Sequence, residues 1–108
     1  MSQAPKAKPP RNKAQRPHYK LRLYVIGDGP NSTQALTNLH SLCQEHLQGR
    51  CTIETVDVAK DLGAAAKDNI LITPALILLA PLPRVVVLGN LSDRKKLLLA
   101  LRLTHGDV

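Results

Sequence analysis

An apolar, β-branched run near the start of the chain ends in a glycine-rich turn and leads at once into a helical pattern. The run covers residues 21–26, the turn reads Gly-Asp-Gly-Pro over residues 27–30, and Asn31 and Gln34 have capping-box spacing. In many α/β proteins such a strand-to-helix corner holds the chemistry, because helix amides point outward there. This corner has no cysteine, histidine or lysine, which favours a binding module over an enzyme.

The remaining patterns alternate between strand and helix. Apolar positions at three- and four-residue steps predict that the first helix, capped by Asn31, continues to about residue 47, and Gly49 provides a left-handed stop. A helical crossover makes the next strand parallel to the first. The elements expected after it are a strand over 51–58, a short helix within 59–69, a strand over 75–80, a turn over 81–83, a strand over 84–88, and a helix capped by Ser92-Asp93 and running over 97–103.

The predicted order is βαβαββα, two parallel strands followed by a hairpin. This is the thioredoxin-like arrangement, an α/β fold with a mixed four-stranded sheet and helices on both faces. Thr73-Pro74 precedes the third strand, where that fold commonly has a cis proline, so Pro74 is the candidate for one. A single domain is expected over residues 21–104.

The positive charge of the chain is concentrated before this domain. Residues 1–20 hold six basic side chains, no acidic one and four prolines, so we interpret them as a disordered basic arm. The rest of the chain holds nine basic and eight acidic side chains, and residues 105–108 form a short tail. A solubilising extension is favoured over nucleic-acid binding. Tyr19 and Tyr24 are the only aromatic residues, which is no platform for stacking bases.

The sequence predicts neither a secretory signal nor a membrane span. The basic start lacks an apolar core, and the longest uncharged run, residues 69–83, contains three prolines. That run also falls short of the roughly 20 apolar residues that a span needs. A cytoplasmic location is therefore expected, and Cys43 and Cys51 fit it as buried core thiols without a disulfide framework.

The motifs that mark common enzyme and cofactor sites are missing from the sequence. Thioredoxin chemistry needs Cys-x-x-Cys at the start of the first helix, and residues 28–32 hold no cysteine. The four histidines lack metal-ligand spacing, and no lysine follows the glycine turn as a phosphate-binding loop requires. We therefore expect no catalytic residue, no cofactor and no metal. A thiol-disulfide or other thioredoxin-fold enzyme is kept as the disfavoured alternative.

Several short motifs resemble, in order and spacing, those of the KaiB circadian clock proteins. The resemblance runs from Leu21 to Leu103, and the ordered set is specific although each motif alone is weak. The motifs are Leu23-Tyr24-Val25, Pro30-Asn31-Ser32, Ala35-Leu36, Val56-Asp57-Val58, Ile70-Leu71, Thr73-Pro74, Pro81, Pro83 and Gly89-Asn90-Leu91-Ser92-Asp93-Arg94.

The resemblance implies a non-enzymatic regulator that binds the ATPase ring KaiC and helps it to capture or release KaiA and the kinase SasA, whose sensor domain is itself similar. It also implies fold switching, in which a resting oligomer has a second fold of the C-terminal half and the thioredoxin-like state binds KaiC. On this basis partner contacts are assigned to Arg22, Gln34 and Arg84, and the fold-switch hinge to Gly89 and Asn90.

The sequence departs from the family pattern at charged positions. Gln34 stands where clock members usually carry arginine, two valines follow Arg84 where a basic pair is usual, and Asn90 replaces aspartate. The acidic C-terminal extension is reduced to residues 106–108, so a divergent paralogue is favoured over the core oscillator subunit. Local helix and strand propensities in the C-terminal half agree with the thioredoxin-like state. We therefore expect a mainly monomeric protein, with a tetramer confined to the alternative fold.

Overall fold

The computed structural model describes residues 17–103, whose helices and strands follow the predicted order βαβαββα. The predicted arm up to residue 16 and the predicted tail over 105–108 lie outside the described residues. None of the helices in the described part is long and apolar enough to cross a membrane. The elements are β2 (Tyr19–Val25), α1 (Pro30–His46), β3 (Cys51–Asp57), α2 (Leu62–Lys67), β4 (Ala75–Ala80), β5 (Val85–Leu88) and α3 (Arg94–Ala100).

The four strands form one mixed sheet in the order β3-β2-β4-β5. Strand β2 pairs in parallel with β3, with Leu23 opposite Thr55. Strand β4 runs antiparallel to both β2 and β5. The parallel pair follows from the crossover through α1, because parallel neighbours need a long connection. The structure therefore confirms the predicted sheet, including the hairpin that turns at residues 81–83.

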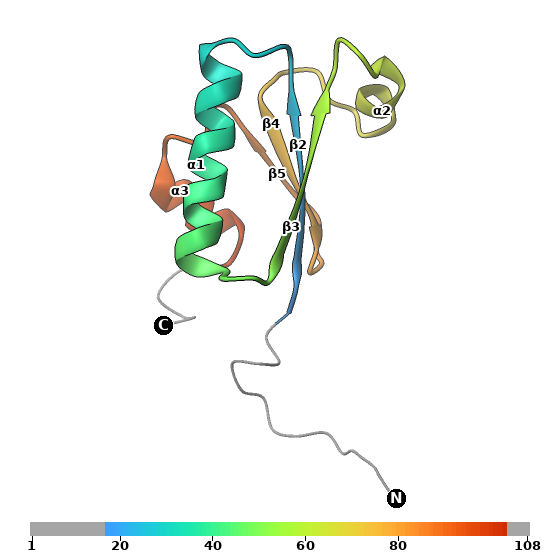
Figure 1. The fold of residues 1–108 in the computed structure, drawn as a ribbon. Coiled ribbons are helices and arrows are strands. Elements are labelled where there is room, and N and C mark those ends of the chain that lie inside the picture. Colours follow the sequence, from blue (N-terminus) through green and yellow to red (C-terminus); the bar gives the residue numbers. More distant parts are fainter. Residues whose placement is uncertain (1–16, 104–108) are drawn as a thin grey trace, which may run out of the picture.

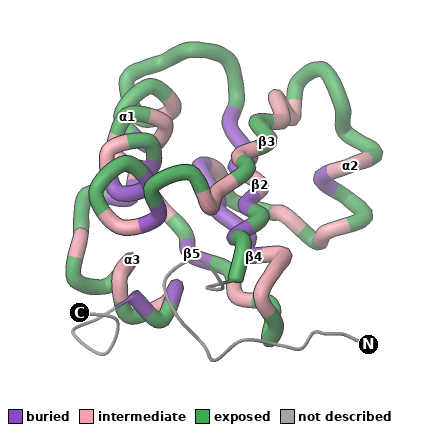
Figure 2. The backbone as a smooth tube through the Cα atoms, turned by 60° about the horizontal axis from the view of Figure 1, so that its bottom comes forward, coloured by how far each residue is buried: buried purple, intermediate pink, exposed green. Residues whose placement is uncertain are grey.

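Helices cover the two faces of the sheet unequally (Figure 1). Helices α1 and α3 lie on one face, and α2 lies on the other, near the end where β2 and β3 finish. Helix α2 buries one side chain, Ala65, whereas the side of α1 that faces the sheet is buried along much of its length (Figure 2). The face that carries α2 is therefore partly open, and Val86 and Leu88 of β5 are exposed.

Alternating side chains of β2 supply both faces of the sheet. Leu21 and Leu23 join the larger buried cluster with residues of α1 and α3. Tyr24 points to the other side, where it forms the smaller cluster with Ala65 of α2 and with Ile77 of β4. This period-two pattern is what a strand buried on both faces requires. Most of the core consequently lies between the sheet and the pair of helices α1 and α3.

Strand β2 begins two residues earlier than the sequence predicted. Tyr19 is 5% exposed, and its hydroxyl donates to the carbonyl oxygen of Leu101 at 2.9 Å. Its backbone amide donates to the carbonyl oxygen of Arg50 at 2.7 Å. Tyr19 and Lys20, which were assigned to the arm, therefore belong to the sheet.

The helix termini differ from the prediction in their caps. Helix α1 begins at Pro30 with Gly29 as its N-cap and no side-chain cap, so the predicted Asn31 cap is wrong. Proline suits the first helical position, because an amide there has no intrahelical partner to lose. Helix α3 is capped by Asp93, whose Oδ1 accepts from the amide of Lys96 at 3.0 Å. It ends at Ala100 rather than at residue 103.

Glycines and prolines shape the loops. The peptide bonds that precede Pro74, Pro81 and Pro83 are cis. Gly49 has a left-handed φ of 83°, as its predicted role as a helix stop requires, and Gly89 has a φ of 103°. In the turn after β5 it is Leu91, not Asn90, that takes the next positive φ.

Candidate functional site

The corner between β2 and α1 is a tight turn that is hydrogen-bonded to the end of β3. Gly27 has a left-handed φ of 62°, and its amide donates to Oδ1 of Asp57 at 3.2 Å. The hydroxyl of Ser32 donates to the carbonyl oxygen of Ile26 at 3.1 Å. The Ser32 bond closes the turn on itself and the Gly27 bond ties it to the end of β3, and the corner carries neither a thiol nor a lysine. Its geometry is that of a structural turn and not of a phosphate loop or a dithiol site.

A charged cluster lies on the sheet face that carries α2. At its centre is Asp68, directly after α2, with 6% of its side chain exposed. Arg22 donates from Nη1 to Asp68 Oδ2 at 3.0 Å, and Arg84 donates from Nη2 to Asp68 Oδ1 at 2.6 Å. The Tyr24 hydroxyl donates to Asp68 Oδ2 at 2.5 Å, and Arg22 Nε donates to Glu54 Oε1 at 2.9 Å. These five residues, here called the Asp68 cluster, connect β2, β3, α2 and the start of β5.

The contacts of the Asp68 cluster fix the charge of its members. The hydrogen bond from Tyr24, followed by those from Arg84 and Arg22, lowers the pKa of Asp68 to about 2. Burial, followed by the hydrogen bond to Asp68, raises the pKa of Tyr24, and hydrogen bonds to Glu54 and Asp68 raise that of Arg22. At neutral pH a carboxylate therefore faces two cations and a neutral phenol. This arrangement stabilises structure and gives Asp68 no proton to donate.

Arg84 is the outward-facing cation of this cluster. Its side chain is 48% exposed, against 28% for Arg22. Val86 and Leu88 follow it along the edge strand β5, paired with Ile77 and Ala75 of the smaller core cluster, and they are exposed. We call Arg84, Val86 and Leu88 the β5 surface. A cation beside exposed apolar side chains is a combination found at protein–protein contacts.

Gln34 lies in a different group. Its Oε1 accepts from Nδ2 of Asn90 at 3.2 Å, and Nδ2 of Asn38 donates to the carbonyl oxygen of Asn90 at 2.9 Å. Helix α1 is thereby tied to the turn between β5 and α3, where Gly89 and Asn90 were predicted as a hinge. The structure thus brings Arg22 and Arg84 together at Asp68, and places Gln34 with Asn90.

Sequence reasoning missed Asp68 and Tyr24 as members of a site. One signal was present, because a tyrosine inside an apolar strand needs a partner for its hydroxyl once it is buried. Arg22 is two positions before Tyr24, so its side chain lies on the same face of the strand. The sequence could therefore have predicted that Tyr24 and Arg22 share a carboxylate partner. It could not have predicted that this partner is Asp68.

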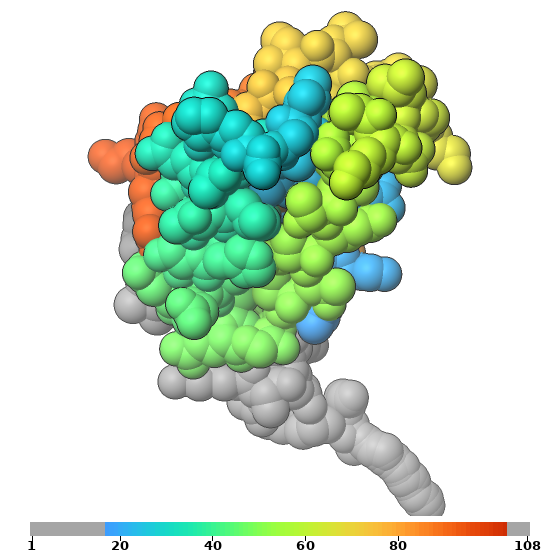
Figure 3. Space-filling view, turned by 45° about the horizontal axis from the view of Figure 1, so that its top comes forward, coloured from blue at the N-terminus to red at the C-terminus, as the bar shows by residue number. Residues whose placement is uncertain are grey.

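A second exposed apolar area lies at the end where β2 and β3 finish. The turn after β2, helix α2 and the segment before β4 meet there (Figure 3). These segments expose Ile26, Leu62, Leu71 and Ile72, of which Leu71 is 93% exposed. The corner that would carry the thiols of a thioredoxin is therefore flanked by exposed apolar side chains.

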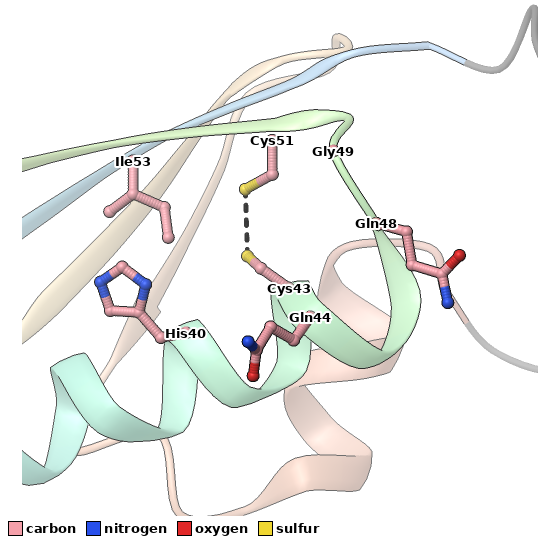
Figure 4. Close-up of a pocket in the computed structure, with 7 residues that line it drawn as sticks. All are labelled: His40, Cys43, Gln44, Gln48, Gly49, Cys51 and Ile53. Carbon is pink, nitrogen blue, oxygen red and sulfur yellow. Dashed lines mark hydrogen bonds between the residues drawn. The ribbon is translucent and has the colours of Figure 1, made fainter.

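Cys43 of α1 and Cys51 of β3 meet, although the sequence treated them as separate core residues. Their Sγ atoms are 3.0 Å apart (Figure 4). Cys43 is buried as predicted, whereas the prediction for Cys51 is wrong, because it is half-buried at the wall of a cavity of about 340 Å³. Within residues 17–103, no three histidine, cysteine or acidic side chains are grouped to hold a metal ion.

Comparisons with known proteins assign the chain to a family. The family profile described as the KaiB domain matches residues 22–103. A Circadian clock oscillator protein KaiB from Synechococcus elongatus is 41% identical over 90 residues, which cover 83% of this chain and 88% of that protein. The chain belongs to the KaiB family. The resemblance predicted from the ordered motifs is thereby confirmed.

A further relative agrees with this family assignment, and solved structures share the fold. A Circadian clock oscillator protein KaiB from a Nostoc species is 39% identical over 97 residues, covering 90% of this chain and 89% of that protein. The N-terminal domain of SasA from Synechococcus elongatus superposes with a TM-score of 0.67 at 20% identity, covering 93% of this chain and 98% of that one. The Drosophila thioredoxin Deadhead superposes with a TM-score of 0.64 at 14% identity, covering 85% of this chain and 86% of that one. These likenesses confirm the thioredoxin-like fold.

Proposed function

We propose that this KaiB-family protein is a non-enzymatic regulator that binds a KaiC-like ATPase or a SasA-like histidine kinase in its thioredoxin-like fold. The observation that carries the proposal is family membership combined with a corner that lacks the dithiol of thioredoxin chemistry. The names of the curated relatives are those of clock oscillator proteins, which supports a regulatory role. A KaiA-like protein is a further candidate partner, and the cytoplasm is the proposed location.

The β5 surface is the proposed contact for that partner. Its apolar members Val86 and Leu88 are 50% and 47% exposed, although both are strand residues. Arg84 is held by the Asp68 carboxylate at 2.6 Å, so less side-chain entropy is lost when it binds. Strand β5 also lies at the sheet edge, and among residues 17–103 no strand pairs with its outer backbone groups. Exposed apolar side chains, a held cation and an edge strand together support this surface as the proposed contact.

Introducing a charge into this surface tests the proposal. We expect Val86→Asp to weaken binding to the immobilised KaiC-like ring, or to the SasA-like kinase, by about tenfold, because it places a carboxylate in an apolar contact. Leu99→Asp is the matched control, since Leu99 is 60% exposed but lies on α3, which packs on the opposite face. Equal affinities of the two variants, or no binding of the native chain to either partner, would contradict the proposal.

The thioredoxin-like state is proposed as the predominant one, with the family's alternative fold as a minor species. Support comes from the contacts of Gln34 and Asn38 with Asn90, which hold the proposed hinge against α1. We expect chemical shifts typical of strand over residues 85–88 and of helix over 94–100, in a protein that sediments as a monomer. Helical shifts over 85–88 or extended shifts over 94–100, in a tetramer, would reverse this preference.

Two other functions make different predictions. A thiol enzyme would reduce insulin with turnover, and the turnover would vanish in Cys43→Ser. Nucleic-acid binding through the basic arm would show a steep salt dependence. That binding would be lost on deletion of residues 1–16, which leaves β2 whole. Neither property is expected of a regulator that acts through the β5 surface.

A further inference from the structure

We propose that Cys43 and Cys51 are a redox modification site, at which a small glutathione-type disulfide converts the two thiols into a reversible intramolecular disulfide. Their Sγ atoms lie 3.0 Å apart. A disulfide bond is about 2.05 Å long, so an approach of roughly 1 Å closes it. The chain has two cysteines, and each is thus the other's sole partner within the molecule.

The fold itself holds the two thiols together. Cys43 lies in the last turn of α1, and Cys51 is the first residue of β3. The connection between them is short and internally hydrogen-bonded. The amide of Leu47 donates to the carbonyl oxygen of Cys43 at 2.8 Å, and the amide of Arg50 donates to the carbonyl oxygen of Leu47 at 2.5 Å. The sulfur contact is therefore part of how the helix returns to the sheet.

The two thiols differ in exposure and in acidity. Cys43 is buried, whereas Cys51 is half-buried. The hydrogen bond between the two thiols lowers the pKa of Cys51, and the same bond together with burial raises the pKa of Cys43. Cys51 is therefore the thiol that reacts first, since the thiolate is the nucleophile in exchange. Cys43 is positioned to resolve the product.

A cavity gives a reagent access to the pair. It has a volume of about 340 Å³ and is lined by both cysteines, by His40 and Gln44 of α1, and by Gln48, Gly49 and Ile53. Figure 4 shows the sulfur atoms between the helix and the strand, with the His40 and Gln44 side chains on the helix side. Glutaminyl amides donate and accept hydrogen bonds, and the peptide backbone of glutathione offers matching groups.

The exchange is balanced in atoms and electrons. The Cys51 thiolate attacks one sulfur of the small disulfide, whose S–S bond breaks, and the departing thiolate takes up the proton that Cys51 released. The Cys43 thiol then loses its proton and attacks Sγ of Cys51, which releases the second small thiolate, and that thiolate takes up the proton. One small disulfide becomes two thiols, and two protein thiols become one disulfide. Excess small thiol reverses the reaction.

A reversible disulfide fits both the proposed cytoplasmic location and the half-buried position of Cys51 better than a permanent one. Disulfides in reducing compartments are mostly transient and redox-sensing, and the partly open position of Cys51 leaves the bond accessible to reductants. Closing the bond ties the end of α1 to the start of β3 and restricts the unfolded chain. We therefore expect the oxidised protein to melt roughly 10 °C higher than the reduced protein.

Treatment of the full chain with glutathione disulfide, followed by intact-mass measurement and thiol labelling, tests this proposal. The native protein is expected to lose two hydrogens and both reactive thiols without keeping an adduct. Cys43→Ser is expected to keep a glutathione adduct on Cys51, and Cys51→Ser to remain unmodified. Excess reduced glutathione restores the native thiols and removes the gain in melting temperature.

Three results would overturn the proposal: a lasting glutathione adduct on the native chain, a disulfide-linked dimer, or two free thiols after treatment. Because a serine at a buried position can impair folding, the alanine variants of both cysteines are measured in parallel, with circular dichroism as the check on the fold. The native protein alone gives a second criterion. A melting temperature that does not rise on oxidation, or that falls, also contradicts the proposal.

Discussion

Asp68→Asn is expected to destabilise the protein by about 2 kcal/mol at neutral pH, since it removes the carboxylate on which Tyr24, Arg22 and Arg84 converge. Asparagine keeps the size of the side chain, so packing changes little. The substitution leaves Arg22 and Arg84 without their shared counter-charge. The Asp68 side chain is only 6% exposed, so water replaces its carboxylate poorly. Urea unfolding at a series of pH values measures the effect.

The lowered pKa of Asp68 determines how its contribution to stability changes with pH. The pKa of Asp68 falls from an ordinary value of 3.8 to about 2 in the folded protein. Its contribution is therefore complete above pH 3.8 and is lost as the pH falls through about 2. The native protein should lose more stability than Asp68→Asn across that interval.

Asp28→Asn is the matched control for this experiment, because Asp28 is exposed in the turn after β2. The control should remain within about 0.5 kcal/mol of the native protein at neutral pH. Parallel pH profiles for the native protein and Asp68→Asn would show that ionisation of Asp68 is not linked to folding, which would contradict the prediction.

Leu97→Ala is expected to lower the free energy of unfolding by about 3 kcal/mol. Leu97 is 1% exposed and joins the larger core cluster from α3. A helix of seven residues cannot persist alone in water, so α3 depends on this packing. Leu99→Ala, at a site in the same helix that is 60% exposed, should change stability by less than about 0.5 kcal/mol. Both values come from urea unfolding followed by circular dichroism.

Equal losses in the two leucine variants would show that α3 does not pack through Leu97. A selective loss in Leu97→Ala has a further use, because it weakens the thioredoxin-like state in the half of the chain that the family is expected to refold. Sedimentation of this variant then reports whether the alternative oligomer gains population. Leu99→Ala again provides the reference, since it alters the same helix without reducing the core.

The order of elements was predictable because its signals are local. The β-branched runs, the glycine turn after β2 and the proline pair before β5 each act within a few residues. The ends of elements were less predictable, since they depend on distant contacts. The start of β2 at Tyr19 rests on a bond to Leu101, 82 positions away.

The candidate site shows the same division between local and distant signals. Arg22 and Asp68 are 46 positions apart and Asp68 and Arg84 are 16 apart, so their meeting depends on how α2 sits over the sheet. No spacing rule predicts such a contact. Cys43 and Cys51 are eight positions apart across one predicted turn, and their contact could have been deduced from the helix stop at Gly49.

The uneven cover of the sheet gives its two faces different amounts of buried apolar contact. Helix α2 contributes Ala65 to the smaller buried cluster and is held further by its Asp61 cap and by the bonds of Asp68, whereas α1 and α3 share the larger core. Local opening free energy follows the amount of buried apolar contact. We therefore expect the smaller apolar cluster under α2 to open at lower cost than the larger core, with the bonds of Tyr24 to Ala64 and Asp68 as its main restraint. A partner on the β5 surface would contact the face with the smaller apolar core, where Asp68 holds Arg84, and would leave the larger core untouched.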